Sequence, residues 1–161
     1  YLKNQKVFLL IKFIVNKELE FYKNFNPDLS PKQMLQYGVF GGSYLGNTIE
    51  EYPKSWFSKA KLSKKFDVKL NYFQIKSGLT LEEWKKKGWI MEEDPRGWFQ
   101  WYCRFTLGRR IPEVDRIQIS RWKAFGPRHI GGIKKNCPKK FFSCRKKQRQ
   151  ALLQWAYNPF F

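Results

Sequence analysis

Residues 94–125 read DPRGWFQWYCRFTLGRRIPEVDRIQISRWKAF, and this stretch decides the fold because its aromatic residues recur at helical spacing. Asp94-Pro95 is a helix start signal, and Gly108 is typical of the position just past a helix end. On a helical wheel of residues 95–107, four aromatic side chains fall within an arc of about 100°, the width of a core-facing stripe: Trp98, Trp101, Tyr102 and Phe105. The stretch therefore predicts a helix whose aromatic face lies in the core.

Helix signals recur along the rest of the chain. Further helices are predicted where start and stop signals bracket apolar residues at helical spacing: 31–37, 81–87, 112–125 and 145–157. The first 24 residues fit either one amphipathic helix or a strand leading into a helix. We expect a mainly α, compact, multi-helix single domain, with a small strand element near the N-terminus as the open alternative.

The composition supports one folded domain. The 161 residues are 42% hydrophobic and 19% aromatic, enough apolar surface to build a core despite the many charges. We expect residues 1–29 to be an N-terminal segment that packs on a basic, aromatic-rich globular domain over residues 30–161. The longest apolar run, VFLLIKFIV at 7–15, is too short for a membrane span. The chain begins at Tyr1, so a preceding segment is expected, and the residues give no address within the cell.

The strongest clue to function is the net charge of +19, from 32 basic and 13 acidic residues. So much positive charge repels itself unless an anionic partner is present, and nucleic acid is the commonest such partner. An anionic membrane surface and an acidic protein are the alternatives. We therefore expect a non-catalytic protein that binds DNA or structured RNA, or a structural subunit of a ribonucleoprotein or other large complex.

Arginine marks the predicted contact surface. No arginine occurs before Arg96, and all nine fall between Arg96 and Arg149. The planar guanidinium binds phosphate through two hydrogen bonds and stacks on bases, which the lysine ammonium does not. The predicted nucleic-acid-binding residues are Arg96, Phe99, Gln100, Arg104, Arg109, Arg110, Arg116, Arg121, Lys123, Arg128, His129, Lys134, Lys135, Arg145, Lys146, Lys147 and Arg149.

Within this set, Arg96, Gln100 and Arg104 lie opposite the aromatic stripe and are predicted to point outward, and Phe99 is predicted to be free to stack on a base. Arg104, Arg109 and Arg110 are predicted to converge at one exposed corner, where three guanidiniums need an anion. The helix, glycine turn and second helix also resemble a helix-turn-helix unit, although acidic residues would then stand at the leading end of the recognition helix.

Arg121 falls in the middle of the apolar arc of the helix 112–125. A charge there must pair with a carboxylate, for which Asp94 is the candidate, or the arc must open onto a bound phosphate.

An enzyme acting on nucleic acid is the alternative function. Glu92, Glu93 and Asp94 are the only clustered carboxylates beside the arginine-rich segment. Their spacing is not a known metal motif, and Asp94 is already explained as a helix N-cap. We expect no metal and no cofactor.

The three cysteines, Cys103, Cys137 and Cys144, are too few for a disulfide framework. With a single histidine they also offer too few ligands for a closed zinc site. We expect three inert thiols and an intracellular, reducing compartment.

Four long motifs resemble those of an uncharacterised family of cellular and large-virus proteins. They are SPKQMLQYGVFGGSY, LNYFQIKSGLTLEEWKKKGWI, DPRGWFQWYCRFTLGRR and RKKQRQALLQWAY, and together they span most of residues 30–157. The resemblance implies one compact domain and carries no activity.

Overall fold

The computed structural model describes the backbone of residues 2–161 and the side chains of residues 4–161. Over this range the fold is mainly α, as the sequence predicts. Its β-structure is limited to one isolated antiparallel bridge, between Met91 and Asp94. The α-helices are α1 (Leu2–Lys23), α2 (Pro31–Gln36), α3 (Leu81–Lys86), α4 (Trp98–Thr106), α5 (Pro112–Asn136) and α6 (Lys146–Gln154). Four short 3₁₀ helices span Val39–Gly42, Gly46–Glu51, Lys54–Trp56 and Val68–Leu70.

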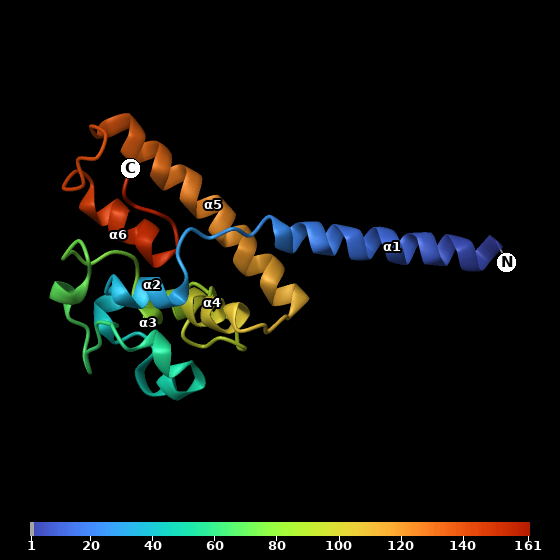
Figure 1. Cartoon of the computed structure of the whole chain (residues 1–161), viewed down its shortest axis with the longest axis horizontal. Helices are drawn as coiled ribbons and strands as arrows, with labels where there is room; N and C mark the ends of the chain where they lie inside the picture. Colours follow the sequence, from blue (N-terminus) through green and yellow to red (C-terminus); the bar gives the residue numbers. More distant parts are fainter. Residues whose placement is uncertain (1) are drawn as a thin grey trace.

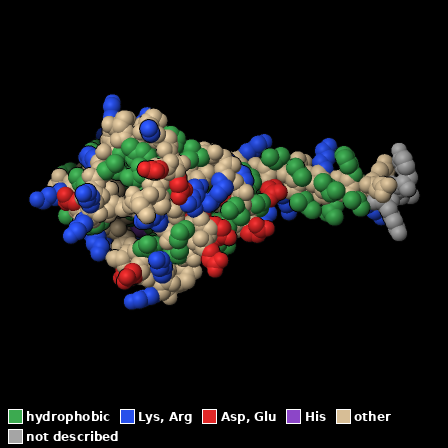
Figure 2. Space-filling view, turned by 90° about the horizontal axis from the view of Figure 1, so that it is seen from below, with side chains coloured by type: hydrophobic (Ala, Val, Ile, Leu, Met, Phe, Trp, Pro, Cys, Tyr) green, Lys and Arg blue, Asp and Glu red, His purple; other side chains and the backbone are tan. Residues whose placement is uncertain are grey.

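Helix α1 is continuous, so the alternative of an N-terminal strand is wrong. It projects from the body of the molecule (Figure 1), and its apolar side chains from Val7 to Leu19 are exposed along its length (Figure 2). Its last turn joins the body, where the Tyr22 hydroxyl donates a hydrogen bond to the buried Asp115. No helix within residues 2–161 has the length and apolar character needed to cross a membrane.

The predicted aromatic stripe of α4 is confirmed. Trp98, Trp101, Tyr102 and Phe105 are all buried, and Trp101 is completely so. Phe25, in the segment after α1, packs edge-on against three rings of α4 and α5 at centroid distances of 4.9 to 5.7 Å. The core therefore joins the N-terminal third of the chain to the aromatic helix.

Helix starts follow the sequence closely. Ser30 and Thr80 each form a capping box, with Gln33 and Glu83 respectively, at the predicted starts of α2 and α3. Helix α4 begins at Trp98, three residues after the start that Asp94-Pro95 predicts. The chain first turns at Gly97, whose φ of 98° is favoured only for glycine.

Helix α5 continues eleven residues beyond the predicted stop at Gly126-Pro127. Gly126 is buried within α5, and a Cβ at this position would lie 2.1 Å from Cζ of Tyr157. The glycine therefore makes room for the tyrosine ring and does not end the helix. Pro127 has no amide hydrogen to donate to the carbonyl of Lys123, and the helix continues through it. The extension carries Arg128 and His129 over α6, which lies beside α5 (Figure 1).

Candidate functional site

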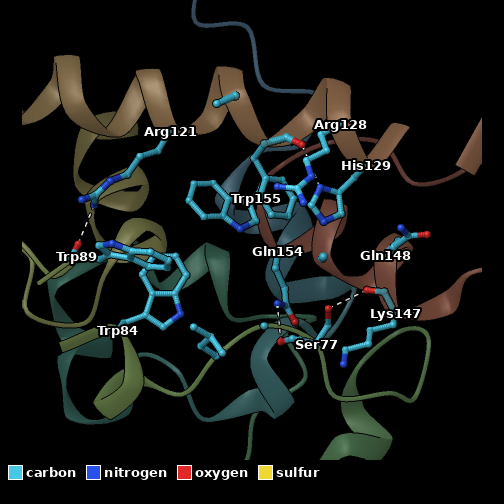
Figure 3. Close-up of a pocket in the computed structure, with 15 residues that line it drawn as sticks. Ser77, Trp84, Trp89, Arg121, Arg128, His129, Lys147, Gln148, Gln154 and Trp155 are labelled. Carbon is cyan, nitrogen blue, oxygen red and sulfur yellow. Dashed lines mark hydrogen bonds between the residues drawn. The ribbon is translucent and has the colours of Figure 1, made fainter. Parts of the chain in front are cut away.

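A cavity of about 700 Å³ lies between α5, α6 and the segment from Ser77 to Trp89 that includes α3. Helix α5 covers it from one side with Arg121, Arg128 and His129 (Figure 3). Lys147 lines the cavity from the start of α6, and Trp155 lines it from the position directly after α6 (Figure 3). The volume is typical of a site that binds a small molecule or a single unit of a polymer.

Five of the fifteen residues that line the cavity carry aromatic rings. The rings of His129, Phe125 and Trp155 stack in series, with centroid distances of 4.0 and 4.9 Å and interplanar angles of 17° and 19°. Trp84 lies 6.0 Å from Trp155, and Trp89 lies edge-on 5.2 Å from Trp84. Trp89 is 41% exposed, which is a large apolar area for an indole to leave in water.

Three cations also line the cavity: Arg121, Arg128 and Lys147. Arg128 and Lys147 are exposed, and Arg121 is half-buried. Burial lowers the pKa of the Arg121 guanidinium. Among the described residues, no side-chain carboxylate lies within 4.0 Å of any of the three, and no acidic residue lines the cavity.

Hydrogen bonds hold the lining in place. Arg121 donates to the carbonyl of Trp89 at 2.7 Å, which ties α5 to the segment after α3. Ser77 Oγ donates to the Lys147 carbonyl at 2.7 Å, and Gln154 Nε2 donates to the Ser77 carbonyl at 3.1 Å (Figure 3). His129 Nδ1 lies 3.1 Å from the Phe125 carbonyl and must donate to it, because a carbonyl only accepts.

The predicted exposed corner of Arg104, Arg109 and Arg110 is wrong, because the chain supplies its own anions there. Arg104 and Arg109 both bind Asp94, whose carboxylate is fully buried. Arg104 also forms an ion pair with Glu51 at 2.9 Å. Asp94 is therefore neither the N-cap of α4 nor the partner of Arg121, and its oxygens are not free for catalysis.

Other predicted contact residues on α4 are also engaged within the chain. Arg96 donates to the Tyr44 carbonyl and to Asn47, and Gln100 is buried, accepting a hydrogen bond from the Arg96 amide. Phe99 is 1% exposed and packs on Phe40 and Tyr44. Helical periodicity missed this because a second layer of the fold, residues 39–51, covers the face of α4 opposite the stripe.

Arg110 and the start of α5 are occupied as well. The Arg110 guanidinium lies 3.6 Å above the Phe105 ring and donates to the Phe105 carbonyl. Asp115 accepts hydrogen bonds from Tyr22, Trp101 and the amide of Ile111. Asp115 is therefore a buried structural residue at the start of α5, and the resemblance to a helix-turn-helix unit stays a prediction.

Arg149 is a buried structural residue, contrary to its predicted role in binding. Its side chain has no exposed surface and donates to the carbonyls of Cys144, Pro159 and Phe161. Burial lowers the pKa of this guanidinium. It ties the C-terminal segment to the loop that precedes α6.

The remaining predicted cations lie on the surface outside the cavity. Arg116 pairs with Glu18, and Lys123 and Lys134 lie over the rings of Phe21 and Phe161. Lys135, Arg145 and Lys146 are exposed. Of the predicted set, the structure thus brings together four residues at one hollow: Arg121, Arg128, His129 and Lys147.

Cys137 and Cys144 form a disulfide, so the prediction of three free thiols is wrong. Cys103 is the buried free cysteine, and burial raises its pKa well above the usual range. The disulfide closes the loop between α5 and α6, and it gives no support to a reducing compartment.

The tryptophans that line the cavity are not among the residues predicted from the sequence to bind nucleic acid. Trp84 and Trp89 stand on either side of a run of three lysines, and such interleaving of rings and cations is typical of nucleic-acid contacts. No family model, curated protein or solved structure matches the chain. The resemblance of the four motifs to an uncharacterised family stays a prediction.

Proposed function

We propose that this protein binds nucleic acid through a cationic surface centred on the cavity between α5 and α6. One observation carries the proposal: Arg121, Arg128 and Lys147 line a cavity that also holds several aromatic rings, and no acidic residue is among its lining side chains. Elsewhere the chain neutralises converging arginines with its own carboxylates, as Asp94 and Glu51 do for Arg104 and Arg109. The cations at the cavity therefore call for an anion from outside.

The surface extends beyond the cavity. Further exposed cations lie near the end of α5, in the loop before α6 and at the first residue of α6: Lys134, Lys135, Lys139, Lys140, Arg145 and Lys146. A line of cations of this kind follows a phosphate backbone and attracts it over distances of about 10 Å at moderate salt. An acidic protein would satisfy the charge equally, but the exposed indole of Trp89 favours a partner that offers flat rings together with anions.

The test is a titration of labelled oligonucleotides, as DNA and RNA and in single- and double-stranded form, over a salt series. Each neutralised phosphate contributes about 0.7 to the log–log salt slope on a single strand, so several contacts predict a total above about 3 in magnitude. A flat salt dependence would overturn the proposal.

Two matched double variants test whether the cavity cations, and not net charge alone, determine the affinity for nucleic acid. Arg128→Gln with Lys147→Gln removes two exposed cavity cations and should reduce the salt slope by about 1.4. Lys64→Gln with Lys65→Gln removes the same charge from exposed positions outside the cavity lining. Equal losses of affinity in the two variants would show that only net charge matters.

A further inference from the structure

We infer that the cavity holds one unstacked nucleotide of a single-stranded nucleic acid, with its base against the aromatic rings of the lining and its phosphate on Arg128 and Lys147. This inference rests on the proposed function and adds to it the strand type and the chemical unit that is bound. It predicts that bases, and not phosphates alone, contribute to affinity.

The hydrogen-bonding groups of the lining favour an acceptor-rich ligand. Four lining carbonyls already accept hydrogen bonds from neighbouring side chains: those of Ser77, Trp89, Phe125 and Lys147. The two lining amide oxygens are engaged as well, Gln148 Oε1 by Arg145 and Gln154 Oε1 by Gln150. Arg128 and Lys147 retain charged donors, so the occupant must bring oxygen or ring-nitrogen acceptors and negative charge.

The rings supply the place for the base. His129, Phe125 and Trp155 stack on one another, so their faces cover each other, and Trp84 and Trp89 stand across the cavity from α5 (Figure 3). The Trp89 indole, which is 41% exposed, is the lining ring most open to a base. Stacking on aromatic side chains accepts any base, because every base has a π face. A nucleotide combines this flat ring with a phosphate, which matches rings and cations placed side by side.

The position of the cavity between α5, α6 and residues 77–89 favours a single strand. In a duplex each base is stacked and paired inside the helix, so it can enter a hollow between protein helices only after it leaves the stack. The phosphates of a duplex would therefore contact the exposed cations Arg128 and Lys147, but its bases would not contact the aromatic rings. A single strand pays little to unstack one base and gains both kinds of contact.

The experiment compares three ligands at fixed salt: a single-stranded oligonucleotide, an abasic strand of equal length and charge, and a nucleoside monophosphate. We expect the intact strand to bind at least about tenfold more tightly than the abasic strand, from stacking of one base. Equal binding of these two strands would overturn the inference, whereas salt-dependent binding of both would leave the proposed function standing. A monophosphate that binds as tightly as the strand would identify a free nucleotide as the occupant and overturn the strand assignment.

Two variants locate the base. Trp89→Leu should lower affinity for the intact strand about tenfold and leave the abasic strand unaffected. Phe8→Leu, at an aromatic that is 67% exposed on the projecting α1, is the matched control and should change neither. Ala124→Phe fills the cavity from α5 without removing a ring or a charge, and it should remove the preference for the intact strand. If Trp89→Leu impairs folding, this filling variant decides, and wild-type preference in it would overturn the inference.

Discussion

Asp94 and Arg109 form a two-pronged ion pair in which Nη1 and Nη2 of the arginine lie 2.9 and 2.6 Å from the two carboxylate oxygens. The carboxylate has no exposed surface, and Arg104 donates to it as well at 3.0 Å. Asp94 and Glu51 together thus neutralise two arginines that the sequence predicted to bind phosphate. This separates arginines that build the fold from arginines that face a ligand.

Replacing Asp94 by Asn should therefore destabilise the fold. The two guanidiniums lose their shared countercharge, but each is about a quarter exposed and keeps some hydration. We expect a loss of roughly 2 kcal/mol in urea unfolding, below the ~3–5 kcal/mol of a fully buried pair. Glu92→Gln, at an exposed neighbouring carboxylate, should be close to neutral. Native stability in the Asp94 variant would refute this structural role.

Arg149 is expected to act on stability and not on binding. Its side chain is buried among the carbonyls of the loop before α6 and of the C-terminal segment. Arg149→Met leaves these carbonyls without their charged donor and should lower the unfolding free energy by more than about 2 kcal/mol. Arg145→Met, at an exposed arginine four residues earlier, is the control for stability. A stable Arg149 variant with weakened oligonucleotide binding would restore the sequence-based role.

Alkaline pH should weaken the fold through its buried tyrosines. Burial raises the pKa of Tyr52 and of Tyr157 from 10.0 to about 12. The folded state holds these protons more tightly than the unfolded state, so their contribution is complete below pH 10 and is lost as the pH rises toward 12. Urea unfolding at pH 8, 10 and 11 measures the decline. Tyr157→Phe should flatten it, and an unchanged slope in that variant would contradict the assignment.

The sequence predicted elements from local signals and failed where distant segments meet. The helix starts at Ser30 and Thr80 depend on residues three positions apart in the sequence, and both are present as predicted. Gly126 is read as a helix stop on local grounds, yet its role is set by Tyr157, 31 positions along the chain. Likewise Arg104 is neutralised by Glu51, 53 positions away, a contact that no periodicity encodes. Arg128 and His129 were predicted from composition, but three of the rings at the same cavity come from distant parts of the chain: Trp84, Trp89 and Trp155.

The cysteine arrangement predicts a definite pattern of thiol labelling. Without reductant, unfolded protein should expose one alkylatable thiol, that of Cys103, and with reductant all three. Because the bond closes a short loop, Cys137→Ser with Cys144→Ser should lower stability by about 2–3 kcal/mol under oxidising conditions. Mass spectrometry after alkylation counts the thiols, and three labels without reductant would contradict the disulfide.

Arg121 distinguishes a charge held for the fold from one held for a ligand. Its guanidinium donates to the Trp89 carbonyl at 2.7 Å and to Gln118 Oε1 at 3.2 Å, and among the described residues no carboxylate lies within 4.0 Å of it. Arg121→Met therefore strands no buried acid, and we expect a stability loss of only about 1 kcal/mol, the net worth of such hydrogen bonds.

In the same variant the affinity for a single strand should fall and the salt slope should decrease by about 0.7, because one phosphate contact is lost. Arg121→Lys keeps the charge but not the fork, so its slope should stay near wild type. Urea unfolding and oligonucleotide titration on the two proteins measure both effects. A stability loss of several kcal/mol with unchanged binding would assign Arg121 to the fold alone, and the cavity would then lose one of its three cations.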